Sequence, residues 1–119
     1  MSDTPTVPRH GLIAQLTGWI LSVYGTRHTA EEIQQHLLEV MERKTYLVEV
    51  DGDQVVGYAE WAWPLGSTTT LHVLELLARR PDILWKLKGK LDQLPWTFVY
   101  FRRQKTGRWR HYRRVPIHV

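Results

Sequence analysis

A carboxylate inside an apolar segment and a histidine between two predicted helices are the residues best suited to chemistry in this sequence. Glu75 lies within residues 71–79, the most apolar run in the second half of the chain. A buried carboxylate needs a hydrogen-bond or ion-pair partner, because an unpaired buried charge is costly. His28 lies in a short inter-helix connection, and an imidazole can serve near neutral pH as a general base or nucleophile. The alternative interpretations are a structural hydrogen bond for Glu75 and a solvated turn for His28.

Two further groups could bind a substrate. Arg79 and Arg80 precede Pro81 at a predicted helix start, where guanidinium groups and helix amides can meet a phosphate. Trp61 and Trp63 alternate along a predicted strand and could line a pocket. Solvated arginines and ordinary strand packing are the alternatives.

The first half of the chain is predicted to form two helices and a hairpin. Residues 9–24 carry apolar side chains at three- and four-residue steps, which predicts an amphipathic helix. Thr29 and Glu32 form a capping-box pattern that begins a second helix. Its buried stripe is predicted to be Ile33, Leu37, Val40 and Met41. Residues 45–50 and 55–63 flank a turn and predict the hairpin.

The second half predicts a central strand, a helix and two more strands. In residues 71–79, alternation places Leu71, Val73, Glu75 and Leu77 on one face, and both faces are largely apolar. Pro81 begins a third helix that ends at Pro95. Residues 96–103 and 108–115 predict the last strands.

The order is ααβββαββ, which indicates a single α+β domain over residues 1–119 with a loose tail at residues 1–8. The sheet is expected to be mixed, mostly antiparallel and covered by helices, with one right-handed crossover. This arrangement is typical of the GNAT acetyltransferase fold, in which a strand, helix and strand surround an acyl donor. Residues 79–84 contain no glycine, unlike the glycine-rich pyrophosphate loop of ordinary acetyl-coenzyme A enzymes with that fold.

Composition excludes several classes of function. The chain of 119 residues has no cysteine, which removes disulfides and thiolate chemistry. The histidines lack metal-ligand spacing, so no metal is expected. No segment reaches the roughly 18 apolar residues of a membrane span, and residues 1–7 do not read as a signal peptide. A cytoplasmic protein is expected.

The basic charge is concentrated near the end of the chain. Residues 96–119 hold seven of the sixteen lysines and arginines and no acidic residue. Such a face suggests an anionic partner. The candidate basic partner surface comprises Arg102, Arg103, Arg108, Arg110 and Arg113.

Several segments, in order, resemble the toxin-activating lysine acyltransferases, the hemolysin-activating enzymes that fatty-acylate RTX protoxins. The similar segments are residues 19–21 with His28, 46–48, 56–62, 73–78, 84–87 and the closing hairpin. The resemblance implies that His28 and Glu75 are the catalytic pair, with Glu75 where the family has aspartate. It also implies that acyl-acyl carrier protein, through its acyl-phosphopantetheine, is the donor. The loop at residues 64–70 is shorter than the family's connection.

The first hypothesis is therefore an acyltransferase that moves a fatty acyl group from acyl carrier protein to a lysine or other amine of a protein. No bound cofactor is expected, and homodimerisation is left open. In this hypothesis Arg79 and Arg80 bind the donor, and Trp61 and Trp63 border the acyl channel. The second is a binding module without catalysis that uses the basic aromatic hairpin on nucleic acid or a protein; nucleic acid is the less favoured partner.

Overall fold

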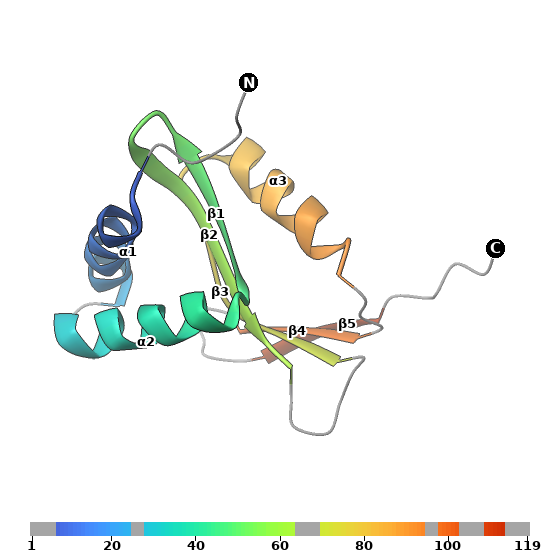
Figure 1. Cartoon of the computed structure of the whole chain (residues 1–119). Helices are drawn as coiled ribbons and strands as arrows, with labels where there is room; N and C mark the ends of the chain where they lie inside the picture. Colours follow the sequence, from blue (N-terminus) through green and yellow to red (C-terminus); the bar gives the residue numbers. More distant parts are fainter. Residues whose placement is uncertain (1–6, 25–27, 64–69, 95–97, 103–108, 114–119) are drawn as a thin grey trace.

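A five-stranded sheet lies between two helices on one side and a third helix on the other (Figure 1). The computed structural model describes residues 7–24, 28–63, 70–94, 98–102 and 109–113. The elements, in chain order, are α1 (Arg9–Tyr24), α2 (Ala30–Arg43), β1 (Tyr46–Asp51), β2 (Gln54–Ala62), β3 (Thr70–Ala78), α3 (Pro81–Leu91), β4 (Phe98–Arg102) and β5 (Trp109–Arg113). The predicted order and α+β class are confirmed.

The strands follow chain order in the sheet, β1-β2-β3-β4-β5, so β3 is central as predicted. Neighbouring strands pair antiparallel except β3 and β4, which pair parallel. α3 lies in the connection between these two strands, because parallel neighbours need a long crossover. The tight turn between β1 and β2 contains Gly52 at φ 63°, a conformation that glycine adopts without steric cost.

α2 begins with a reciprocal capping box. The Thr29 hydroxyl accepts a hydrogen bond from the Glu32 amide at 3.2 Å, and the Glu32 carboxylate accepts one from the Thr29 amide at 3.1 Å. These bonds satisfy amides that a helix start would leave without partners. The hydrogen bonds from Thr29 lower the pKa of Glu32. The helix then buries the predicted stripe of Ile33, Leu37, Val40 and Met41.

Val7 and Pro8 do not belong to a loose tail, which corrects the prediction for residues 1–8 at these two positions. Val7 is 7% exposed and joins a core with Leu12 and Leu16 of α1. The Pro8 carbonyl accepts a hydrogen bond from the Leu12 amide at 2.9 Å. Burial of the valine side chain offsets the entropy lost in ordering this segment. Residues 1–6 lie outside the described residues.

Each face of the sheet has its own hydrophobic core. On the α1–α2 side, the two helices pack on the inner strands, which contribute Val55, Tyr58 and Leu77. On the other side, α3 packs on a second set of strand residues, which includes Val56, Ala59, Trp61, Leu71 and Val73. β3 contributes to both cores, which explains why its sequence is apolar on both faces.

A β-bulge in β3 changes the side-chain alternation predicted for this strand. The register with β2 shifts so that Leu74 is an extra residue between Val73 and Glu75. Val73 packs in the α3-side core, whereas Leu77 packs in the α1–α2 core. The predicted common face of Leu71, Val73, Glu75 and Leu77 is therefore wrong, because one inserted residue exchanges the two faces.

α3 lies close to the sheet at Gly57 of β2. A Cβ atom at this position would lie 2.5 Å from Cγ2 of Ile83, which is closer than packed atoms can approach. On the neighbouring strand, the buried Glu49 forms ion pairs with Lys86 and Lys90 of α3. The absence of a side chain at Gly57 permits the close approach of the helix, and the ion pairs compensate for the burial of the Glu49 carboxylate.

Candidate functional site

Two carboxylates lie side by side on the α1–α2 side of the sheet. Glu60 of β2 and Glu75 of β3 are register partners in the antiparallel pair, and opposed residues in such a pair point to the same face. Glu60 is 3% exposed, and Glu75 is partly buried. Like charges opposed across strands repel, so two ionised carboxylates at these positions would destabilise the fold.

Glu60 is held by a histidine and a tyrosine. Nε2 of His36 lies 2.6 Å from Oε2 of Glu60, and the Tyr58 hydroxyl donates to Oε1 at 3.1 Å. His36 precedes the buried Leu37 on α2, which brings its ring to the sheet while 49% of its side chain stays exposed. Within the described part of the chain, no buried side-chain nitrogen or oxygen lacks a hydrogen bond. The desolvation cost of Glu60 is therefore met by these two partners.

The electrostatics of this group follow from hydrogen bonding and burial. The hydrogen bond to Glu60 raises the pKa of His36 above its ordinary value, because it favours the imidazolium. Burial raises the pKa of the Tyr58 hydroxyl, and Glu60 and Glu75 raise it further. Tyr58 is therefore a neutral donor at physiological pH, and His36 is a stronger base than a free imidazole.

The two residues predicted to be catalytic lie on different elements. His28 lies just before α2 with 60% of its side chain exposed, and its Nδ1 is 3.8 Å from Oε2 of Glu32. Glu75 lies in β3 opposite Glu60. The histidine hydrogen-bonded to a carboxylate beside Glu75 is His36, about two helical turns after His28. A catalytic partnership of His28 and Glu75 remains a prediction.

The ladder between the parallel strands is short. It joins Thr70–Val73 of β3 to Phe98–Phe101 of β4, whereas β3 continues to Ala78. Glu75 therefore follows the last residue of β3 that pairs with β4. Along the rest of β3, no described residue of β4 is a ladder partner. The carboxylate pair thus lies just beyond the pairing between β3 and β4 that the structure describes.

Several solved structures with a similar fold are named as acetyltransferases. The aminoglycoside 6'-N-acetyltransferase from Enterococcus faecium matches with a TM-score of 0.55 at 17% identity, over 78% of this chain and 55% of that protein. An aminoglycoside 6'-N-acetyltransferase solved with coenzyme A matches with a TM-score of 0.58 at 17% identity, over 76% and 54% of the two chains. A protein from Desulfovibrio desulfuricans assigned to the GNAT family matches with a TM-score of 0.53 at 15% identity, over 80% and 67%. The chain has the GNAT fold.

The GNAT fold predicted from the element order is thereby confirmed. The chain spans little more than half the length of the two aminoglycoside enzymes. No protein-family model matches the sequence, and no curated protein does. The resemblance to the toxin-activating lysine acyltransferases remains a prediction from the sequence.

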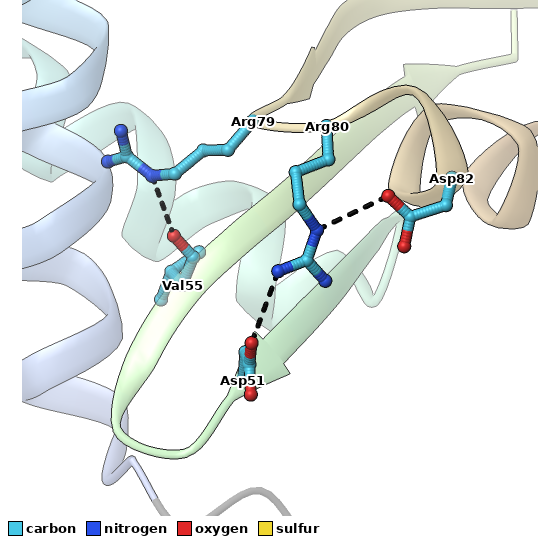
Figure 2. A network of polar contacts seen from close by, with 5 residues as sticks. All are labelled: Asp51, Val55, Arg79, Arg80 and Asp82. Carbon is cyan, nitrogen blue, oxygen red and sulfur yellow. Dashed lines mark hydrogen bonds and ion pairs between the residues drawn. The ribbon is translucent and has the colours of Figure 1, made fainter.

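Arg79 stands at the end of β3 and is held by groups of the protein (Figure 2). Its Nε donates to the Val55 carbonyl at 3.1 Å, and its guanidinium carbon lies 4.2 Å from the ring centroid of Trp19. The side chain thereby joins the end of β3 to β2 and to α1. Its predicted role in donor binding would compete with these contacts.

Arg80 follows Arg79 in the connection between β3 and α3, and its side chain lies between two carboxylates (Figure 2). Its Nη1 lies 3.2 Å from Asp51, and its Nε lies 3.2 Å from Asp82 in the first turn of α3. The hydrogen bonds to Asp51 and Asp82 raise the pKa of Arg80. The Arg80 side chain is 49% exposed, and Arg79 is exposed as well. A phosphate at Arg80 would compete with the carboxylates of Asp51 and Asp82.

Trp61 and Trp63, predicted to border an acyl channel, lie with the α3-side core. Trp61 is 7% exposed within that core. Trp63 is partly buried and packs against it. Their positions agree with the alternative of ordinary strand packing, and a channel role stays a prediction.

The basic partner surface is described only through its backbone. Arg102 ends β4, and Arg110 and Arg113 lie in β5, opposite Phe101 and Phe98. Arg103 and Arg108 lie outside the described residues. The role of this surface in binding a partner stays a prediction.

The described residues contain no group of three histidine, cysteine, aspartate or glutamate side chains arranged to hold a metal ion. Nor does the described chain include a helix with the length and apolar character needed to cross a membrane.

The prediction from sequence missed His36, Glu60 and Tyr58. A signal for Glu60 was present, since it interrupts an apolar strand just as Glu75 does, and the cost of burying a carboxylate applies equally to both. Tyr58 lies two residues earlier and therefore on the same face. Nothing local in the sequence pairs His36 with a strand residue 24 positions away.

Proposed function

We propose that this protein transfers an acyl group from a thioester donor to an amine. The observation that supports the proposal is the GNAT fold, with a carboxylate pair placed just beyond the described pairing of the parallel strands β3 and β4. The solved neighbours are named as N-acetyltransferases, and their named substrates include aminoglycosides, which carry amines. Transfer to an amine is the reaction class that this chain would share with them.

The proposed donor carries its acyl group on phosphopantetheine, which occurs both in coenzyme A and in acyl carrier protein. One neighbour was solved with coenzyme A. The connection between β3 and α3 holds Arg79, Arg80 and Pro81 in place of a glycine-rich loop. The resemblance to the toxin-activating enzymes favours the carrier protein. In this proposal Arg80 at the start of α3 meets a donor phosphate, and the basic residues of the final strands attract the acidic carrier.

The proposed acceptor is a lysine or another amine of a protein substrate. An ammonium group has no lone pair and must lose a proton before it can attack the thioester carbonyl, and the attacking amine loses another as the amide forms, so a base is required. In the reaction suggested by the resemblance, His28 removes this proton or takes the acyl group covalently, and Glu75 stabilises the imidazolium. Glu75 lies at the end of the parallel ladder, which supports its placement near a thioester bound between the strands.

The experiment that tests the proposal measures free-thiol release from acyl-coenzyme A and from acyl-acyl carrier protein, each with and without lysine-containing peptides. Release that depends on the amine supports the reaction class, and the preferred donor distinguishes coenzyme A from the carrier. Glu75→Gln is expected to lower the rate by at least about 100-fold while leaving the circular dichroism spectrum unchanged. The same loss in His28→Ala would assign the base role to His28, as the resemblance suggests. A folded wild-type protein that releases no thiol from either donor would contradict the proposal.

A further inference from the structure

We infer that His36, held by the buried carboxylate of Glu60, is the general base that takes a proton from the acceptor amine. The inference rests on the proposed function, because it assigns a catalytic residue to that reaction. It also differs from the assignment to His28 that the sequence suggests, and the two assignments can be separated by experiment.

The hydrogen bond to Glu60 gives His36 the tautomer that a base needs. A carboxylate can only accept, so the 2.6 Å contact requires a proton on Nε2 of the imidazole. The lone pair of the neutral ring is then on Nδ1. Nδ1 takes no part in this hydrogen bond, and 49% of the side chain is exposed to solvent. The carboxylate therefore fixes the ring while leaving a basic nitrogen for a substrate, the arrangement found in histidine–carboxylate catalytic pairs.

The supporting carboxylate is itself fixed. Glu60 is 3% exposed and receives a second hydrogen bond from the Tyr58 hydroxyl at 3.1 Å. A carboxylate with both oxygens bound in a buried strand has little freedom to rotate away. Precise support of this kind is what a catalytic imidazole needs, since small displacements lower the rate greatly.

The position of the pair agrees with a role in acyl transfer. Glu60 is the register partner of Glu75, and Glu75 follows the last β3 residue that pairs with β4. Glu60, which supports the base, and the end of the described parallel ladder therefore lie on adjacent strands, β2 and β3. An incoming ammonium group would also be attracted by the two carboxylates before it loses its proton.

The charged groups around His36 come from each element packed near it. α2 contributes Glu39 and Arg43, β2 contributes Glu60, and β3 contributes Glu75 beside it. The Tyr58 hydroxyl donates to Glu60 from β2, and Tyr46 of β1 is the register partner of Glu60. On α1, Arg9 and His10 lie in the first turn. The hydrogen bond and charge of Glu60 dominate and raise the pKa of His36.

The step balances in atoms and electrons. The acceptor ammonium first releases one proton to solvent. The neutral amine nitrogen then forms a bond to the thioester carbonyl carbon while Nδ1 of His36 accepts one N–H proton. The carbonyl π electrons move to oxygen and return as the carbon–sulfur bond breaks. The thiolate leaves with the bonding pair and takes the proton back from the imidazolium, which yields an amide and a free thiol.

The test compares the wild-type protein with His36→Gln and Glu60→Gln. His10→Gln is the matched control, because His10 is an exposed histidine at the start of α1. We expect kcat to fall about 100-fold or more in His36→Gln, and to be unchanged in His10→Gln. In Glu60→Gln, kcat should fall less and the acidic limb of the kcat against pH profile should move to lower pH. Histidine NMR titration should show the pKa of His36 falling in the same variant. If Glu60 had a purely structural role, the acidic limb of the kcat profile would not move with that pKa.

The outcomes are distinguishable from failure of the proposed function. If the wild type transfers acyl groups and His36→Gln, shown folded by circular dichroism, keeps kcat and its pH profile, the inference is overturned and the reaction class stands. Should His28→Ala then abolish transfer, the base role returns to His28. If the wild-type protein transfers no acyl group, the proposed function fails and this assignment with it.

Discussion

Glu60 of β2 faces Glu75 of β3 across the antiparallel pair, so the buried carboxylate that binds His36 lies beside the carboxylate predicted to be catalytic. The bulge at Leu74 brings this about, because it places Glu75 on the α1–α2 side while Val73 packs under α3. The site therefore combines Glu75, which the resemblance predicts to be catalytic, with His36 and Glu60, which the fold brings into contact.

The contact between His36 and Glu60 is expected to make stability depend on pH. The folded-state pKa of His36 is raised above the ordinary value of 6.5. The contribution of the contact to stability is therefore fully present below that value and is lost as pH rises through the folded-state pKa. The difference in unfolding free energy between wild type and His36→Gln should be larger at about pH 6 than at about pH 9. Urea denaturation at several pH values measures it. A difference that does not change with pH would show that the imidazolium gains nothing from Glu60.

Gly57→Ala is expected to destabilise the fold. The new Cβ atom would lie 2.5 Å from the side chain of Ile83 and 3.1 Å from that of Leu87, so these side chains or α3 itself must shift, at a cost of roughly 1–3 kcal/mol. Gly89→Ala is the matched control, since nothing lies within 4 Å of its Cβ position and alanine favours a helix by up to about 1 kcal/mol. Chemical denaturation compares them. Equal stability of the two variants would contradict the close packing of α3 on β2.

Thr29→Ala should weaken the start of α2. The substitution removes the hydroxyl that accepts from the Glu32 amide, and loss of such a cap costs about 1 kcal/mol. Thr29→Ser keeps the hydroxyl and should retain most of the stability. If alanine and serine variants unfold at the same denaturant concentration, the capping box does not stabilise the protein.

Arg79 and Arg80 are expected to separate into a structural and a substrate-binding residue. Arg79→Ala loses the contact with Trp19 and the hydrogen bond to Val55, so the unfolding free energy should fall by roughly 1–3 kcal/mol. Arg80→Ala removes exposed ion pairs and should change stability little. Its expected effect is a higher KM for the acyl donor. The reverse pattern, with Arg80 needed for stability and Arg79 for donor binding, would refute this division.

Local signals in the sequence predicted the elements well. The three- and four-residue apolar steps gave a helix that begins at Arg9 and ends at Tyr24, as observed. The capping box at Thr29 and the turn around Gly52 also depend only on neighbouring residues. The parallel crossover followed from the order of the elements.

Non-local contacts were beyond the sequence. The bulge at Leu74 arises from pairing with β2, and strict alternation therefore wrongly grouped Val73 with Glu75 and Leu77, which lie on the other face. His36 and Glu60 meet only because α2 packs on β2. The contact of the Arg79 guanidinium with Trp19 likewise joins residues far apart in the chain, and the predicted role of Arg79 in donor binding stays a prediction.

The most direct test of acyl transfer is the mass of the amine product. The purified protein would be incubated with an isotope-labelled acyl thioester on coenzyme A or on acyl carrier protein, together with lysine peptides and small amines. We expect the labelled acyl mass on an amine with at least one donor, and its loss in Glu75→Gln. Absence of any acylated amine with both donors, from protein whose fold is verified by circular dichroism, would contradict the assignment of acyl transfer to this GNAT fold.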